Sequence, residues 1–556
     1  MPGRRSVRSR PGARARQGAA QLVAAQSPLQ ATESEDARLA AQAYDEFPYE
    51  GHSFPLTHPE RLATIAGLFG LQPPPAEGAR VLELGCGTGG NLIPMALAMP
   101  GATFTGFDLS GVQIERAREA ISALGLRNIT VAQRNILDVG KEADGFDYII
   151  CHGVYSWVPE NVQERILAIC RESLSKNGVA LISYNTYPGW HLRESVREMM
   201  RYHVRQFSDP KLQVTQSRAL LDFLVKSIDS EKTAHGMYLA GELKLLSRCD
   251  DHYIAHEHLE RWNAPVYFHQ FAERLARHDL QFLGESEFGS MMVKNLAAPV
   301  AKALSQGISD VLRMEQYMDF IRNRMFRSTL VCHREQRLDR NVDSARVMRL
   351  YVAAGVKDDR TAEAKLPGQE NFAALNGVRF HTNDDLTKAA IRILAAAWPR
   401  AILFEELFAD AARAAGITEG PPEAYRRRLA ANLLSLYASN AVEFHSIPST
   451  FVTSAPEKPR TTSLVRLQAS RKARVTNLRH ESLPVNEIER RVLRLLDGTR
   501  GRSEVVSELM AGVVAGQLSL KRGGQPITEP ADCASQLERM YDQILLQFGR
   551  KALLVA

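Results

Sequence analysis

Residues 80–91 constrain the fold more than any other part of this 556-residue chain. They read Arg-Val-Leu-Glu-Leu-Gly-Cys-Gly-Thr-Gly-Gly-Asn, an apolar run typical of a buried strand followed by a glycine-rich turn. The turn carries Gly85, Gly87 and Gly89. Glycine lets the backbone pass close to a ligand at positive φ. A second apolar run, 102–109, contains Asp108 near its end, where an acid is placed to accept the hydroxyls of a ribose. The two segments predict a cradle for a nucleoside-containing cofactor.

The glycine pattern alone leaves two cofactor classes open. Gly85, Gly87 and Gly90 also satisfy the GxGxxG pattern of dinucleotide-binding enzymes. Glu83 stands two residues before the first glycine, and a carboxylate repels a pyrophosphate at close range. The same carboxylate favours a ligand that carries an ammonium and a sulfonium group. Glu83 therefore favours such a ligand over a nicotinamide dinucleotide.

Five motifs in register resemble the class I S-adenosylmethionine-dependent methyltransferases. They occupy residues 81–89, 106–110, 134–136, 146–154 and 177–183. The resemblance implies an α/β fold with a Rossmann-like doubly wound sheet, and S-adenosylmethionine as the cofactor. Carried over position by position, it implies contacts to the methionine portion, the ribose and the adenine. The residues concerned are Glu83, Gly85 and Gly87 for the methionine portion, Asp108 for the ribose, and Leu109, Asn135 and Ile136 for the adenine.

Further segments resemble bacterial proteins with a methyltransferase regulatory domain, including the rickettsial outer-membrane-protein lysine methyltransferases. These segments are 54–59, 184–190, 256–260 and 495–499. The likeness covers roughly residues 40–556 and implies a homodimer that methylates lysine ε-amines of surface proteins. No motif identifies the methyl acceptor, so a small metabolite or a lipid-like molecule remains an alternative acceptor. A non-catalytic regulator that senses the cofactor is a third alternative, against which the intact glycine loop weighs.

Strands and helices alternate through the first half of the chain, which predicts a parallel sheet with helices on both faces. The expected strands are 80–85, 102–108, 128–133, 146–151 and 178–184. A helical region at 192–262 then interrupts the alternation, and a strand at 280–285 is expected to return to the sheet. We interpret 192–262 as an insertion.

The remaining sequence predicts further domains, because 556 residues exceed one core. The expected parts are a disordered basic tail at 1–35, a methyltransferase domain at 40–290, a mainly helical regulatory segment at 295–375 and a C-terminal winged-helix-like domain at 380–556. The segment 318–330 is arginine-rich, and its arginines are expected to form salt bridges at an internal domain face. Three helices followed by a strand at 441–445 predict that the winged helix starts near Asp384.

Charge and composition limit the classes of molecule that this chain is expected to bind. The net charge is +6, but six arginines precede the first acid, Glu33, and the rest of the chain is close to neutral. This argues against a nucleic-acid footprint. No apolar run approaches the length of a membrane span, and the tail lacks the apolar core of a secretory signal. The six cysteines lie far apart, which predicts reduced thiols in the cytoplasm, and Cys86 is expected to pack beneath the cofactor.

The acceptor is expected at the carboxyl ends of the fourth and fifth strands, where an open α/β sheet binds ligands. The segments there are rich in aromatic side chains, which attract an ammonium group. The rings are Tyr155, Trp157, Tyr184, Tyr187 and Trp190. Packing of helices onto the sheet is the alternative for each ring. His152 is the best-placed general base, with a packing role as its alternative.

One helix face presents histidines and an acid at a spacing found in metal sites. His252, His256 and Glu260 recur every four residues. The sequence His256-Glu257-His258 is not HExxH, and a polar helix face explains the pattern. No metal is therefore predicted.

Overall fold

The computed structural model describes most of the chain beyond residue 50. The described residues are 51–140, 145–229, 232–361, 367–417, 422–522, 525–527 and 529–555. The basic tail predicted at 1–35 lies outside the described residues.

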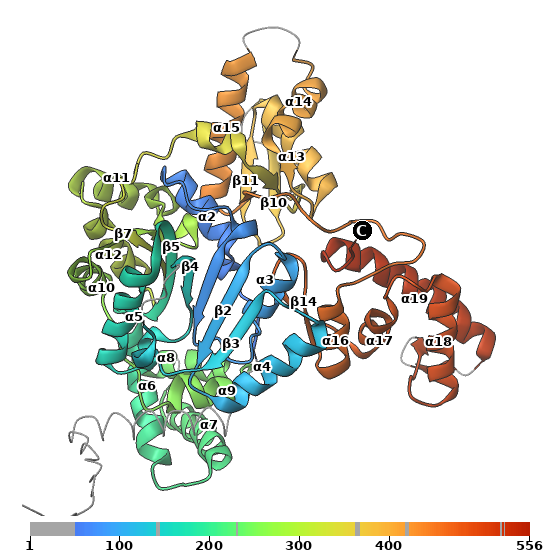
Figure 1. Cartoon of the computed structure of the whole chain (residues 1–556), viewed down its shortest axis with the longest axis horizontal. Helices are drawn as coiled ribbons and strands as arrows, with labels where there is room; N and C mark the ends of the chain where they lie inside the picture. The colour runs from blue at the N-terminus through green and yellow to red at the C-terminus, as the bar shows by residue number, and fades with distance from the viewer. Residues whose placement is uncertain are drawn as a thin grey trace, which may run out of the picture.

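A mixed sheet forms the centre of the molecule (Figure 1). Within the described residues it has seven strands in the order β3-β2-β1-β4-β5-β7-β6. They are β1 (Arg80–Leu84), β2 (Thr103–Asp108), β3 (Ile129–Gln133), β4 (Phe146–Cys151), β5 (Leu174–Asn185), β6 (Leu280–Glu285) and β7 (Phe326–His333). Strands β1 to β5 pair in parallel, and β7 pairs antiparallel with β5 and β6. The carboxyl ends of β1, β2, β4 and β5 therefore share one edge.

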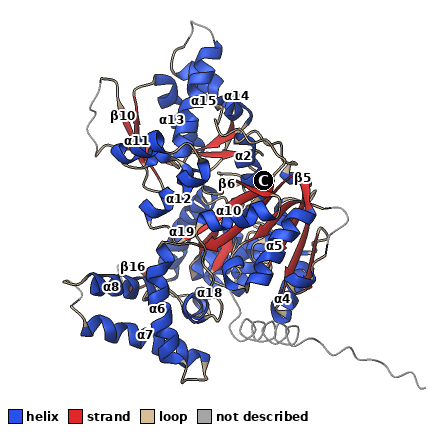
Figure 2. Ribbon diagram, turned by 90° about the vertical axis from the view of Figure 1, so that its left-hand side faces the viewer, coloured by secondary structure: helices blue, strands red, loops and turns tan. Residues whose placement is uncertain are grey.

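Helices bury both faces of this sheet, as the near-continuous apolar strands require. They are α2 (Pro59–Leu68), α3 (Leu92–Ala98), α4 (Gly111–Leu124), α5 (Glu160–Ser173) and α10 (Phe268–Arg277). Side chains of α2, α3 and α4 join one core cluster and those of α5 join another. Helix α10 contributes Phe268 to the first cluster and Phe271 and Leu275 to the second. Figure 2 shows α5 and α10 lying over the strands.

Local sequence explains where α4 begins and ends. The Ser110 hydroxyl accepts a hydrogen bond from the Gln113 N–H at 3.2 Å and caps the first turn. Gly125 closes the helix in the left-handed region, with φ of 64°. The cap places the start of α4 directly after Asp108 at the end of β2.

The region predicted as an insertion forms a helical layer at the lower edge of Figure 1. It consists of α6 (Gly189–Val204), α7 (Pro210–Ser227), α8 (Ala234–Leu246), α9 (Asp251–Ile254) and a π-helical turn, η5 (Ala255–Leu259). A separate apolar cluster, which includes Met200, Leu221 and Leu239, holds these helices together.

The sheet continues into the segment that was expected to be mainly helical. That segment begins with α11 (Ala298–Gly307) and α12 (Val311–Arg322), but β7 follows and inserts between β5 and β6. The domain boundary expected near residue 290 is therefore wrong, because the sheet runs to His333. Asn323, with φ of 47°, ends α12 and lets the chain turn into β7 without a glycine or a proline.

The arginine expected to pair inside this segment does so. Arg327 on β7 is buried, and its guanidinium lies 2.6 Å from Glu285, 3.0 Å from Glu315 and 2.8 Å from Asp319. These pairs tie β7 to β6 and α12. Removing one partner of such a buried cluster leaves an uncompensated charge, so the cluster fixes how the three elements pack.

Two smaller antiparallel sheets and three helices follow. The strands and the preceding 3-10 helix are η8 (Ser344–Arg349), β8 (Tyr351–Ala353), β9 (Val356–Asp358), β10 (Glu370–Ala374), β11 (Arg379–Thr382), β12 (Ile402–Leu403) and β13 (Glu443–His445). The helices are α13 (Asp385–Ala397), α14 (Phe404–Ala414) and α15 (Pro422–Ala438). Their apolar faces join the same core cluster as α2 and α3.

The last part of the chain has a core of its own. Its elements are α16 (Ser463–Arg471), β14 (Arg474–Thr476), β15 (Ser482–Pro484), α17 (Glu487–Leu495), α18 (Arg502–Val514), β16 (Lys521–Arg522), β17 (Gln525–Pro526) and α19 (Pro530–Arg550). In Figure 1 the hairpin strand β14 lies beside α3 of the central domain. No helix in the described ranges is both long and apolar enough to cross a bilayer.

Candidate cofactor and acceptor site

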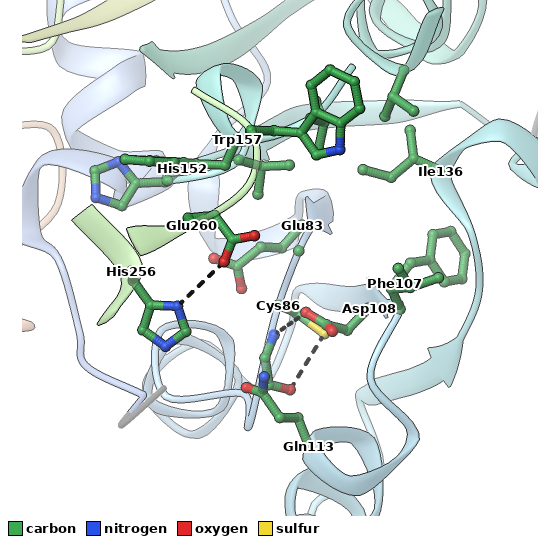
Figure 3. Close-up of a pocket in the computed structure, with 18 of the residues that line it drawn as sticks. Glu83, Cys86, Phe107, Asp108, Gln113, Ile136, His152, Trp157, His256 and Glu260 are labelled. Carbon is green, nitrogen blue, oxygen red and sulfur yellow. Dashed lines mark hydrogen bonds and ion pairs between the residues drawn. The ribbon is translucent and has the colours of Figure 1, made fainter. Parts of the chain in front are cut away.

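A cavity of about 710 Å³ lies at the carboxyl edge of the parallel strands (Figure 3). Every residue expected to contact the cofactor lines it. These residues are Glu83, Gly85, Gly87, Asp108, Leu109, Asn135 and Ile136. They come from the ends of β1 and β2 and from the segment after β3, which the parallel register brings to one edge.

Two positions of the loop after β1 that line the cavity require glycine. Gly85 and Gly87 have φ of 77° and 52°, a region that L side chains rarely adopt. A Cβ on Gly85 would lie 2.4 Å from Val154 Cγ2, and one on Gly87 would lie 2.9 Å from Gln113 Oε1. The loop thus exposes backbone to the cavity.

Two backbone N–H groups orient Asp108. Gly87 N–H donates to Asp108 Oδ2 at 2.8 Å, and Ser110 N–H donates to Asp108 Oδ1 at 2.9 Å. The carboxylate is therefore fixed between the glycine loop and the start of α4. From this position it faces the cavity (Figure 3).

Glu83 is a buried acid with one oxygen left to serve a ligand. Asn91 Nδ2 donates to Glu83 Oε1 at 2.7 Å, whereas Glu83 Oε2 has no hydrogen-bond partner among the described residues. Burial raises the pKa of Glu83 to about 8, opposed by the Asn91 hydrogen bond and assisted by the nearby Asp108 charge. A buried carboxylate without a second partner is costly, so a cation in the cavity would be strongly stabilised there.

These residues fit S-adenosylmethionine. The unpaired Glu83 oxygen matches its ammonium, the fixed Asp108 carboxylate matches its ribose, and Leu109, Phe107 and Ile136 supply an apolar surface for its base. Asn135 lines the same end, although its Oδ1 accepts from Leu137 N–H at 3.0 Å and caps a short 3-10 turn. This bond occupies the amide oxygen of Asn135, and its Nδ2 group can donate to the base.

Two of the six residues expected on the acceptor side line the cavity, His152 and Trp157. His152 packs against the rings of Phe54 and Phe326, with centroids 4.4 and 6.1 Å away. Burial lowers the pKa of His152 to about 4, and its Nδ1 atom has no partner within the described part of the chain. The ring is therefore neutral at physiological pH.

The other four lie outside the lining; they are Tyr155, Tyr184, Tyr187 and Trp190. Tyr155 is fully buried between Phe271 and Tyr184, where it helps to pack α10 on the sheet. Trp190 is also buried and meets Trp157 edge to face at 6.1 Å. Tyr155 and Trp190 thus lie in the core behind the cavity, which is the packing role given above as the alternative for each ring.

Tyr187 differs from those two because it is half-buried and faces the insertion. Its ring stacks on His191 at 3.9 Å, and its hydroxyl donates to Glu194 at 3.1 Å. These contacts hold the first turn of α6 and turn the ring away from the cavity.

The helical insertion supplies cavity residues that the sequence did not identify for the acceptor. They are His256, Glu257, Glu260 and Trp262. Figure 3 shows Glu260 directed at the cavity and paired with His256, whose Nδ1 lies 3.9 Å from Glu260 Oε2. Burial raises the pKa of Glu257. These residues lie in or near a π-helical turn, a feature that recurs at functional sites. The turn is seen only in the structure, so the sequence alone could not point to these residues.

His256 and Glu260, which have the spacing of metal ligands, therefore form a pair at the cavity wall. In the ranges that the structure describes, no group of three histidine, cysteine or acidic side chains is arranged to hold a metal ion.

Three family models match separate parts of the chain. A methyltransferase domain matches residues 75–226, a predicted methyltransferase regulatory domain matches 250–333, and the PKMT C-terminal winged helix domain matches 457–553. The winged helix expected to start near Asp384 therefore lies further along the chain. Three helices before a strand are too common a pattern to locate that module.

Two proteins of Rickettsia prowazekii (strain Madrid E) are similar to this chain. The uncharacterised protein RP789 is 37% identical over 522 residues, covering 92% of this chain and 93% of its own length. The uncharacterised protein RP028 is 42% identical over 241 residues, covering 43% of this chain and 96% of its own length.

The solved structure of PKMT2 from Rickettsia typhi is similar over nearly the whole chain. It is 31% identical, with a TM-score of 0.82, and the match covers 91% of this chain and 100% of that chain. The same protein in complex with AdoHcy matches with the same TM-score over 92% of this chain. That complex shows that a protein of this architecture holds the demethylated form of the cofactor.

Proposed function

Since the chain belongs to the S-adenosylmethionine-dependent methyltransferases that carry a methyltransferase regulatory domain and a PKMT winged helix domain, we propose that it methylates lysine ε-amines of a protein. Methyltransferase activity and the cofactor follow from the family, whereas the lysine acceptor is our proposal.

The acidic and aromatic side chains of the cavity lining carry this proposal. Besides the residues assigned to the cofactor, the cavity is lined by Glu257, Glu260, Trp157 and Trp262, and Phe326 adds a ring from β7. Carboxylates and aromatic faces both attract an ammonium group, and they do so more strongly where water is excluded. A neutral hydroxyl or a carboxylate acceptor would gain little from this lining.

The chain's own residues then position the acceptor and take its proton. Bound S-adenosylmethionine supplies a methyl group on a positively charged sulfur. Glu260 and Glu257 hold the entering ammonium, and the raised pKa of Glu257 makes it a better proton acceptor than a surface carboxylate. His152, neutral and apolar in its contacts, excludes water beside the reacting groups.

The relatives support a protein acceptor. PKMT2 and the winged helix model both carry the name of protein lysine methyltransferases. The likeness to PKMT2 extends through the insertion and the C-terminal domain, which lie beyond the cofactor-binding part. A small-molecule acceptor would need only that first part.

This function is tested by measuring how radioactive methyl groups are distributed between proteins and small molecules. The purified chain is incubated with S-[methyl-³H]-adenosylmethionine and an extract of bacterial surface proteins, and label is counted in acid-insoluble and acid-soluble fractions. We expect label in the protein fraction, reduced at least tenfold by Glu260→Gln, with cofactor affinity kept within about threefold.

Glu273→Gln, a change at an exposed acid of α10 outside the cavity, is the matched control and should leave labelling unchanged. Label confined to the acid-soluble fraction would overturn the protein acceptor. Loss of cofactor binding in Glu260→Gln would instead move Glu260 into the cofactor half.

A further inference from the structure

Asn91 precedes the first residue of α3 but does not cap its own helix. Asparagine at this position normally accepts from an N–H of the first turn, and here no such bond forms. The side chain instead bridges two domains. Its Nδ2 donates to Glu83 Oε1 at 2.7 Å, and its Oδ1 lies 2.8 Å from Nε2 of His480.

The orientation of the Asn91 amide follows from its neighbours. Phe54 N–H, which can only donate, lies 3.1 Å from Asn91 Oδ1, and the Thr57 hydroxyl donates to the same oxygen at 3.1 Å. The amide oxygen therefore faces Phe54 and the nitrogen faces Glu83. His480 must then carry its proton on Nε2 and donate to Asn91.

His480 belongs to the part matched by the winged helix model. It lies in the turn between β14 and β15, with φ of 61°. The Asn477 side chain holds this turn by accepting from the N–H groups of Arg479 and Glu481 at 3.0 and 2.8 Å. Both His480 and Asn91 are buried, with exposed fractions of 6% and 5%.

The same hairpin also holds the segment that covers the glycine loop. Lys472 Nζ donates to Gly51 O at 3.2 Å, and the Ser53 hydroxyl donates to Thr476 Oγ1 at 3.3 Å. Gly51 in turn lies against Gly90, where a Cβ would be 2.3 Å from the Gly51 carbonyl carbon. The contacts of the C-terminal domain thus reach the cofactor loop from two sides.

We infer that His480 is a positioning residue for the cofactor, which acts through Asn91 to hold the Glu83 carboxylate in place. Without its donor, the Asn91 oxygen loses one of three partners and the amide is less firmly held toward Glu83. The winged helix domain therefore completes the cofactor site. Because docking of the hairpin and binding of the cofactor share this chain of hydrogen bonds, each stabilises the other.

Two substitutions at one position separate the hydrogen bond from the packing. His480→Phe keeps a ring and removes the donor, whereas His480→Gln keeps a donor amide. Both place a side chain at the same positive φ, so backbone strain is common to them. Calorimetry with AdoHcy should show affinity about five- to tenfold weaker for His480→Phe and within about twofold of wild type for His480→Gln.

Ser482→Ala, which removes a hydrogen bond to Arg474 in the same hairpin, is the matched control and should not change AdoHcy affinity. Equal affinity for wild type and a folded His480→Phe would overturn the inference. Equal weakening of both His480 variants would also overturn it, because packing and not the donor would then be the cause.

A measurement on the wild-type chain needs no variant to fold. Hydrogen–deuterium exchange is followed with and without saturating AdoHcy. We expect AdoHcy to slow exchange of the turn at residues 477–481, although no residue of this turn lines the cavity. Exchange there that ignores AdoHcy would contradict the link. Both experiments measure only cofactor binding, so their outcome does not depend on whether the methyl acceptor is a lysine.

Discussion

At the scale of single residues, the raised pKa of Glu83 links cofactor binding to pH. Its pKa of about 8 means that the acid holds a proton at neutral pH while the cavity contains no cation. A ligand ammonium stabilises the ionised form, so binding must release that proton. Cofactor affinity is therefore linked to pH through this group.

We predict that AdoHcy binds roughly twentyfold more weakly at pH 6.0 than at pH 7.5, since the ionised fraction of a group with this pKa falls almost tenfold per pH unit. Calorimetry at both values measures it. Glu83→Gln should bind weakly and show a flat dependence. Wild-type affinity that does not change with pH would assign the ammonium to another partner.

The same shift has a consequence for stability. Folding raises the pKa of Glu83 from 4.5 to about 8. Between these pH values the unfolded chain releases the proton that the empty fold retains, so the empty fold becomes less stable as pH rises. Without ligand, Glu83→Gln should therefore unfold at or above the wild-type temperature at pH 7.5. A clear drop in its melting temperature would show that the ionised acid stabilises the fold.

Asp108 gives a second prediction at this scale. A ribose held by charge-assisted hydrogen bonds to a fixed carboxylate should lose about 2–4 kcal/mol in Asp108→Ala. That corresponds to some thirty- to several-hundred-fold weaker AdoHcy binding. Calorimetry on a variant with unchanged circular dichroism tests this, and wild-type affinity would remove Asp108 from the ribose site.

At the scale of elements, Trp190 at the start of α6 supports the cavity from behind. It is buried and meets Trp157 edge to face. Trp190→Ala should cost about 3–5 kcal/mol, as large-to-small changes in a core do. Thermal unfolding should show a lower midpoint for the transition of the central domain. An unchanged midpoint with lost methyl transfer would return Trp190 to the acceptor site.

The strands that the sequence predicted correctly share a local signal. β1 and β4 are mostly apolar runs bounded by glycine or polar turns, because both faces of a parallel sheet are buried, and β2 ends at the acid that follows its buried phenylalanines. β7 lacks this signal. It follows α12 after three residues, contains Arg327, and joins the sheet through partners far away in the sequence.

The residues of the site also differ in how far the sequence alone could predict them. The cofactor residues could be predicted because one loop and two strand ends carry them in a fixed order. The acceptor rings could not, since Tyr155 and Trp157 are two residues apart and only the tertiary fold decides which faces the core. Glu257 and Glu260 come from an insertion whose position over the cavity no local pattern encodes.

At the scale of the whole molecule, parts far apart in the sequence meet at one cavity. The glycine loop, the covering segment at 51–54, the π-helical turn and β7 all line it, and the C-terminal hairpin fixes it through Asn91. This explains why likeness to PKMT2 spans nearly the whole chain.

Identification of the modified side chain tests the central claim most directly. The wild-type chain is supplied with trideuteromethyl S-adenosylmethionine and the labelled protein fraction, and peptides are sequenced by tandem mass spectrometry. The account predicts the heavy-methyl mass increment on lysine side chains, lost with Asp108→Ala and strongly reduced with Glu260→Gln. Heavy methyl groups only on carboxylates, arginines or non-protein molecules would contradict it.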